Sequence, residues 1–104
     1  MILLDKPSLS IISDILIKYL PDEEVRVFGS RVREKCKKFS DIDIVIMNQK
    51  PLSCEKIISL SEMFSNSELL FRVDICQWNN LPDFLKKKIK AESVVIQEGR
   101  NSHK

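Results

Sequence analysis

The spacing of apolar side chains divides the chain into short helices and strands with brief connections. Residues 8–20 carry apolar side chains at helical spacing and are followed by Pro21, so they predict an amphipathic helix. Residues 25–28 predict a short strand that ends at Gly29. Residues 41–47, in which isoleucine alternates with other side chains, predict a second strand.

The second half of the chain repeats this alternation of helix and strand. Ser53 can cap a helix that runs to about residue 65. The apolar face of this helix is expected to comprise Ile57, Ile58, Leu60, Met63 and Phe64. Residues 69–77 predict a third strand, residues 79–83 the start of a helix, and residues 94–96 a last short strand. In the last helix the side chains expected to face inward are Phe84, Leu85 and Ile89.

This order predicts a single α/β (α+β) domain over residues 1–104, built on one mixed β-sheet with helices packed mainly on one face. About four strands form the predicted sheet. The basic stretch 31–38 is expected to form one helical turn and a loop, and residues 99–104 a flexible tail.

Composition limits the chemistry that such a domain can perform. The net charge is only +2, which gives no reason to expect direct binding to nucleic acid or to a membrane. The one histidine, His103, lies in the polar tail, which excludes a Ser-His-Asp centre and a multi-histidine metal site. Three sparse cysteines without a CxxC pair indicate reduced thiols and a cytoplasmic protein.

Two acidic residues on the second predicted strand stand out. Because side chains alternate along a strand, the isoleucines share one face, and Asp41 and Asp43 lie on the other, roughly 7 Å apart. By the same alternation Asp74 leaves the core on the third strand, beside Arg72, which could pair with the carboxylates or a phosphate. If the two strands are neighbours, three carboxylates meet on one face. Two carboxylates about 5 Å apart repel by roughly 3 kcal/mol at an effective dielectric near 20.

A hard cation would relieve this repulsion, and a phosphate-binding turn lies nearby. Magnesium takes oxygen ligands and is commonly held by one or two carboxylates together with substrate phosphates. Gly29 permits a tight turn and close approach of backbone amides to a ligand, Ser30 adds a donor and Arg31 a charge.

The combination of these motifs is typical of one superfamily. Gly29-Ser30, followed after ten residues by Asp41-Ile42-Asp43, matches the Gly-Ser-x10-Asp-x-Asp signature of the polymerase-β-like nucleotidyltransferases. Asp74 lies where that superfamily places its third carboxylate. The chain resembles in particular the minimal nucleotidyltransferases, the MNT antitoxins encoded beside HEPN-domain toxins, and the resemblance covers nearly the whole chain.

The resemblance implies a role for each motif residue. Asp41 and Asp43 would hold magnesium, as a pair of ions, and Gly29 and Ser30 would bind the triphosphate of ATP. Asp74 would bind the catalytic metal and help deprotonate an acceptor hydroxyl, which attacks the α-phosphate and releases pyrophosphate. The implied acceptor is a tyrosine of a partner HEPN ribonuclease toxin, with which the chain would form a hetero-oligomer.

Two alternatives stay open at this point. The chain could be an antitoxin that neutralises its toxin by contact alone, without turnover. It could also be a nucleotidyltransferase that acts on a small molecule, although the sequence shows no acceptor pocket for one.

Overall fold

The structure is a computed structural model that describes residues 6–29, 41–69 and 71–99. Its helices and strands are, in chain order, α1 (Lys6–Tyr19), β1 (Val25–Phe28), β2 (Ile42–Ile46), α2 (Cys54–Ser65), β3 (Val73–Gln77), the 3-10 turn η2 (Trp78–Asn80), α3 (Asp83–Ala91) and β4 (Val94–Gln97). The predicted helical turn at 31–38 lies outside the described residues.

The four strands of the described part form one mixed sheet in the order β3-β2-β1-β4. β1 pairs antiparallel with both β2 and β4, whereas β2 and β3 are parallel. A parallel pair needs a crossover connection, which α2 supplies here. The predicted class, a mixed α/β sheet of about four strands, is confirmed.

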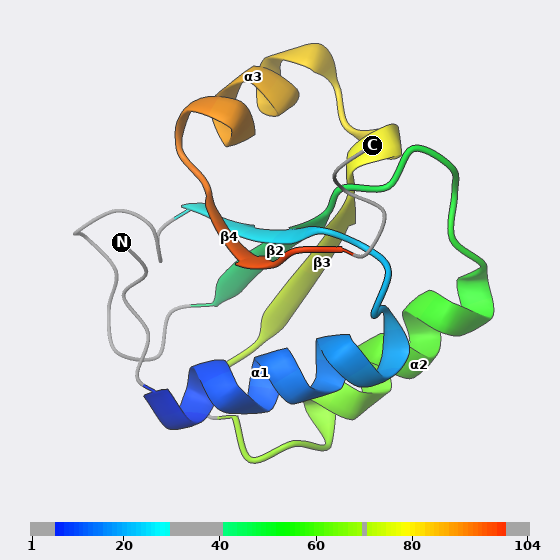
Figure 1. Cartoon of the computed structure of the whole chain (residues 1–104), viewed down its shortest axis with the longest axis vertical. Helices are drawn as coiled ribbons and strands as arrows, with labels where there is room; N and C mark the ends of the chain where they lie inside the picture. The colour runs from blue at the N-terminus through cyan, green and yellow to red at the C-terminus, as the bar shows by residue number, and fades with distance from the viewer. Residues whose placement is uncertain (1–5, 30–40, 70, 100–104) are drawn as a thin grey trace.

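The hydrophobic core lies between the sheet and two helices, α1 and α2, which lie together on one side of it (Figure 1). Alternate strand residues turn to this side and are fully buried, as the isoleucine alternation predicted: Val25, Val27, Ile42, Ile44 and Ile46. The helices meet them with Ile12, Ile15, Leu16, Leu60 and Phe64. Full burial of one such side chain stabilises the fold by roughly 1.5–3 kcal/mol.

The helix α2 begins and packs largely as its sequence predicts. The backbone N–H of Lys56 donates to Oγ of Ser53 at 3.2 Å, which satisfies one of the free donors at the helix start. Leu60 and Phe64 are buried, but the prediction for Ile58 is wrong, because this side chain is 57% exposed. Ile58 lies one position, about 100° around the helix, from the stripe that faces the sheet.

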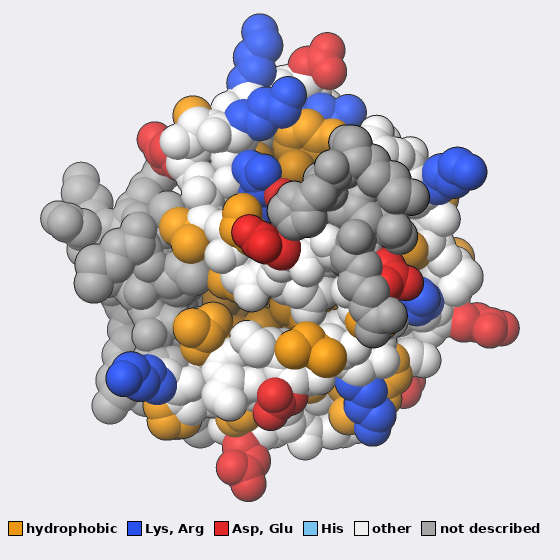
Figure 2. Space-filling view, in the orientation of Figure 1, with side chains coloured by type: hydrophobic (Ala, Val, Ile, Leu, Met, Phe, Trp, Pro, Cys, Tyr) orange, Lys and Arg blue, Asp and Glu red, His pale blue; other side chains and the backbone are white. Residues whose placement is uncertain are grey.

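The helix α3 lies on the opposite side of the sheet (Figure 1). Ile89 is fully buried, whereas Phe84 is 74% exposed, so the prediction that Phe84 faces inward is wrong. Phe84 lies five positions before Ile89, so it points about 140° away from Ile89 around the helix. Lys86 and Lys90 lie over the ring of Trp78, with Nζ 5.4 and 5.6 Å from its centroid. Lysine and arginine side chains gather over α3 in the space-filling view (Figure 2).

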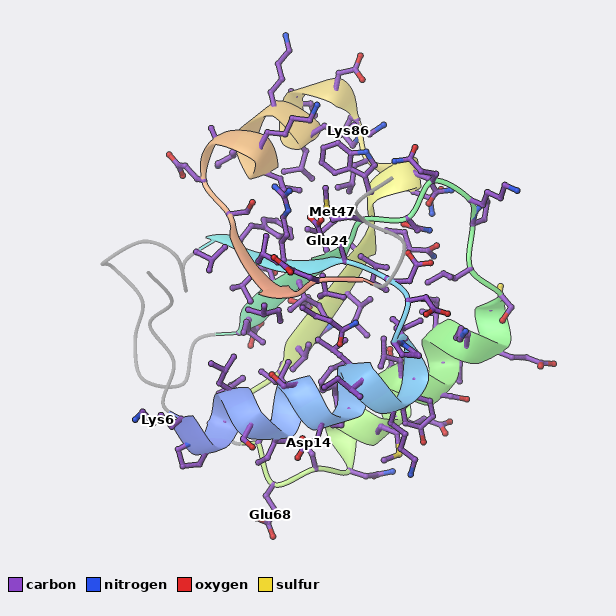
Figure 3. The ribbon with its side chains drawn as sticks, in the orientation of Figure 1. Lys6, Asp14, Glu24, Met47, Glu68 and Lys86 are labelled. Carbon is purple, nitrogen blue, oxygen red and sulfur yellow. The ribbon has the colours of Figure 1, made fainter. Side chains whose placement is uncertain are left out.

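Short contacts tie the ends of the strands together. Met47 donates its backbone N–H to the carbonyl of Glu24 at 2.8 Å, and Figure 3 shows these two residues side by side. Gly99, where the predicted tail begins, is buried against the turn at residues 22–24. No helix in the described ranges is long and apolar enough to cross a membrane.

Candidate active site

Two of the predicted carboxylates lie side by side in the sheet. Asp43 of β2 is the register partner of Asp74 of β3 and also of Phe28 of β1, so Phe28, Asp43 and Asp74 form one row across three strands. Directly opposite residues of adjacent strands have their Cβ atoms about 4.5–5.5 Å apart. The row lies on the face that also carries α3, because the neighbouring isoleucines turn toward α1 and α2.

The third carboxylate, Asp41, immediately precedes β2 and is exposed. Side-chain alternation places it on the same face as Asp43. The pKa of Asp43 is raised above its ordinary value of 3.8, first by burial and then by the charges of Asp74 and Asp41. Burial disfavours the charged form of an acid, and like charges add to this effect. The charges of Asp74 and Asp41 therefore both act on the carboxylate of Asp43.

The side chain of Asp74 lies close to the positively charged side chain of Arg72. Nε of Arg72 lies 3.1 Å from Oδ1 of Asp74, so the pairing that the shared face suggested is present. The side chain of Arg72 is 77% exposed, and exposed ion pairs stabilise a fold by only about 0–1 kcal/mol. Arg72 can therefore leave Asp74 at little cost when a stronger cation binds there.

The chemical type of these side chains suits magnesium, but their arrangement in space suits it only in part. Carboxylate oxygens are the ligands that magnesium prefers, and burial, followed by the charges of Asp74 and Asp41, raises the pKa of Asp43, so a nearby cation would favour its charged form. Within residues 6–29, 41–69 and 71–99, however, no three His, Cys, Asp or Glu side chains come close enough together to hold a metal ion. The structure thus brings Asp43 and Asp74 into register, but the three carboxylates do not form one metal-binding group.

The backbone of Gly29 passes directly beside the carboxylate of Asp43. Gly29 has φ of 81°, a left-handed conformation that favours glycine. A Cβ atom built on it would lie 2.5 Å from Oδ2 of Asp43, so any other residue would displace the carboxylate. The predicted phosphate-binding residues Ser30 and Arg31 lie outside the described residues.

Cys76 lies two residues beyond Asp74 and shares its face of β3. Burial raises the pKa of its thiol, and the charges of Asp43 and Asp74 raise it further. The thiolate is the nucleophilic form of cysteine, so this thiol stays protonated at neutral pH and is unsuited to nucleophilic catalysis.

A feature that the sequence did not indicate lies on the other side of β3. A pocket of about 390 Å³ opens between α2 and β3, and its apolar lining comprises Ile57, Phe64, Phe71, Val73 and Ile75. Arg72 and Asp74 also line it, so the pocket adjoins the acidic row. The sequence patterns place each of these residues on an element, but the gap between two elements depends on how closely they pack.

Comparison with known proteins assigns the family. Residues 11–101 match the family described as "Polymerase beta, Nucleotidyltransferase", and the chain belongs to that family. It is 41% identical over 90 residues to the "Probable protein adenylyltransferase MntA" of Haemophilus influenzae, covering 86% of this chain and 79% of that protein. It is 34% identical over 73 residues to the "Protein adenylyltransferase MntA" of Thermococcus cleftensis, covering 70% of this chain and 73% of that protein.

Solved structures share the fold at lower identity. A chain of a toxin–antitoxin crystal structure with AMP-PNP superposes with a TM-score of 0.72 at 19% identity, covering 88% of this chain and 74% of the other. A chain from the structure of the tri-AMPylated Shewanella oneidensis HEPN toxin in complex with MNT antitoxin superposes with a TM-score of 0.68 at 17% identity. The match covers 93% of this chain and 75% of the other. The predicted membership of the nucleotidyltransferase superfamily, and the likeness to MNT proteins, are confirmed.

Proposed function

We propose that the chain is a magnesium-dependent protein adenylyltransferase, which transfers AMP from ATP to a hydroxyl group of a partner protein. The observation that carries the proposal is the register of Asp43 with Asp74, which places two carboxylates next to each other on neighbouring strands. The names of the relatives from Haemophilus influenzae and Thermococcus cleftensis support the same activity.

Each acidic residue has its own part in the proposed reaction. Asp41 and Asp43 would hold magnesium, with Asp74 as a third ligand, and a bound magnesium ion would supply positive charge to the triphosphate and to the transition state. Asp74 accepts the proton of the acceptor hydroxyl. The hydroxyl oxygen then forms a bond to the α-phosphorus, the bond from that phosphorus to the oxygen bridging to the β-phosphate breaks, and pyrophosphate leaves.

The turn after β1 binds the triphosphate in this proposal. The backbone of Gly29 approaches closely because it carries no side chain, and Ser30 and Arg31 supply a donor and a positive charge. Since Gly29 lies against Asp43, the phosphates it binds lie beside the carboxylates.

The proposed acceptor is a tyrosine of a HEPN toxin encoded beside this chain, and the two proteins form a hetero-oligomer. The titles of the structures of like fold name a toxin–antitoxin with AMP-PNP and an AMPylated HEPN toxin with MNT antitoxin, which supports this choice. The cytoplasmic location stays a prediction. Among the described cysteines, Cys54 and Cys76 are free, as reduced thiols would be.

The proposal is tested by incubating the chain with its neighbour-encoded toxin, magnesium and ATP labelled at the α-phosphate. We expect label on the toxin, and a loss of at least about tenfold in Asp43→Asn, because removal of even a residue that supports a metal ligand typically costs about 10–100-fold. Asp14→Asn is the matched control, since Asp14 lies exposed on α1, away from the sheet (Figure 3). Undiminished labelling by Asp43→Asn would contradict the proposal.

Neutralisation by contact alone is the second candidate. It is favoured by one observation, that no three acids in the described part of the chain converge on a metal position. The two candidates differ in the double variant Asp41→Asn, Asp43→Asn. If this variant still forms the complex and still protects cells from the toxin, masking explains the function; if protection is lost while the complex forms, catalysis explains it.

A further inference from the structure

Among the residues that the structure describes, the strand β3 forms an unpaired edge of the sheet next to the acidic row. It pairs with β2 on one side only, and all five of its residues are half-buried. The backbone N–H of Ile42 donates to the carbonyl of Arg72 at 2.9 Å, so residues 72, 74 and 76 direct their backbone groups toward β2. The backbone N–H and C=O groups of Val73 and Ile75 therefore point away from β2, where another strand can pair with them.

The order of the strands determines from which side an acceptor approaches. Gly29, at the end of β1, and Asp74, on β3, lie on opposite sides of Asp43 on β2. In an in-line displacement the attacking oxygen enters opposite the leaving group. If the leaving pyrophosphate is held at Gly29, the acceptor enters from the side of β3.

The pocket between α2 and β3 lies along the same edge. Its lining comprises Val73 and Ile75, whose backbone groups face outward, apolar side chains of α2 and Phe71, and the polar residues Ser61, Ser65, Arg72 and Asp74. A pocket of this size, about 390 Å³, is large enough for one apolar or aromatic side chain. Asp74 is among the residues that line it, so the pocket lies beside the proposed site.

A strand that paired with β3 would use both features at once. Side chains alternate across a strand, so one would enter the pocket and the next would turn to the opposite face, where the carboxylate of Asp74 lies. Opposite residues of paired strands are about 4.5–5.5 Å apart at Cβ, which brings that second side chain next to Asp74. Main-chain bonds would supply affinity, and the pocket would supply specificity.

We propose that the acceptor protein presents its hydroxyl residue on an extended segment that adds a strand to the outer edge of β3, with an adjacent apolar side chain in the α2–β3 pocket. This inference rests on the proposed function and names how the acceptor is recognised. The occupant is a segment of the partner protein, because a free small molecule would not use the outward backbone groups of Val73 and Ile75.

Two substitutions separate docking from chemistry. Ser61→Trp fills the pocket from an exposed position of α2 that lines it, and Ser59→Trp is the matched control, since Ser59 is exposed on the same helix but does not line the pocket. Val73→Pro removes an outward N–H at the first residue of an edge strand, where proline is tolerated. Val73→Thr keeps that N–H and the branched shape.

We expect Ser61→Trp and Val73→Pro to lower the labelling of the toxin at least tenfold, while magnesium and ATP raise the melting temperature as in the unsubstituted chain. Equal labelling by Ser61→Trp and Ser59→Trp would overturn the proposal. Amide hydrogen exchange in the complex decides the matter without turnover: exchange at Val73 and Ile75 slows at least tenfold if a strand is added and is unchanged if the toxin binds elsewhere. A chain that labels no toxin, yet protects these amides, would refute the proposed function and leave the docking edge intact.

Discussion

At the scale of single residues, the energetic centre of the site is Asp43. It is half-buried, lies directly beside Asp74, and its raised pKa reflects both burial and the neighbouring charges. A group whose pKa is higher in the folded than in the unfolded state destabilises the fold when it is ionised. Asp43 therefore opposes folding at neutral pH until a cation joins it.

This sign gives a pH prediction for the protein without metal. As the pH falls from neutral through the raised pKa of Asp43, its carboxylate takes up a proton in the folded state first, so this group's destabilising effect disappears. Asp43→Asn lacks the effect at every pH. We expect the variant to be as stable as the unsubstituted chain or more stable at pH 7, and the difference to shrink on acidification, as measured by urea unfolding. A large loss of stability at pH 7 would show that this carboxylate serves the fold.

The sequence predicts much of this residue-level picture and misses some of it. Period two along Asp41-Ile42-Asp43 and around Asp74 suffices to put the acids on the face away from the isoleucines. How close the acidic side chains come to one another is set by the register of β2 with β3, which pairs Asp43 with Asp74. That register depends on long-range packing, so the sequence could suggest a meeting of the acids but not which two of them would be paired.

At the scale of elements, α3 is attached to the sheet through few apolar groups. Its only buried residue is Ile89, and Phe84 projects into solvent. The sequence pattern failed for Phe84 because it lies five positions from Ile89, about 140° around the helix, so the two side chains cannot face the same surface. In β2 isoleucine alternates regularly, and the prediction that its three isoleucines share the buried face is correct; in α1 the helical repeat likewise buries Ile12 and Leu16.

Substitutions of Ile89 and Phe84 in α3 are therefore expected to differ strongly in their effect on stability. Ile89→Ala leaves a cavity in a fully buried position and should cost about 2–5 kcal/mol of unfolding free energy. Phe84→Ala removes an exposed ring and should change stability by no more than about 0.5 kcal/mol. Chemical denaturation of both variants measures the contrast. Equal losses would mean that Phe84 packs against the fold in solution.

At the scale of the whole molecule, the strand order gathers residues that are far apart in the sequence. Gly29 directly follows β1, Asp43 lies on β2 and Asp74 on β3, and they are brought together because β2 lies between β1 and β3. The motif spacing predicted the first two as a unit. The pocket beside β3 follows from the separation of α2 from the sheet and had no sequence signal.

The central claim, that these carboxylates bind a metal together with a nucleotide, is tested most directly by the melting temperature with and without magnesium and ATP. A ligand at a hundred times its Kd that binds only the folded state stabilises it by about 2.7 kcal/mol, and each 1 kcal/mol raises the melting temperature of a domain of this size by about 4–8 °C. We predict such a rise in the unsubstituted chain and its loss in Asp43→Asn. A rise of the same size in both proteins would contradict the account.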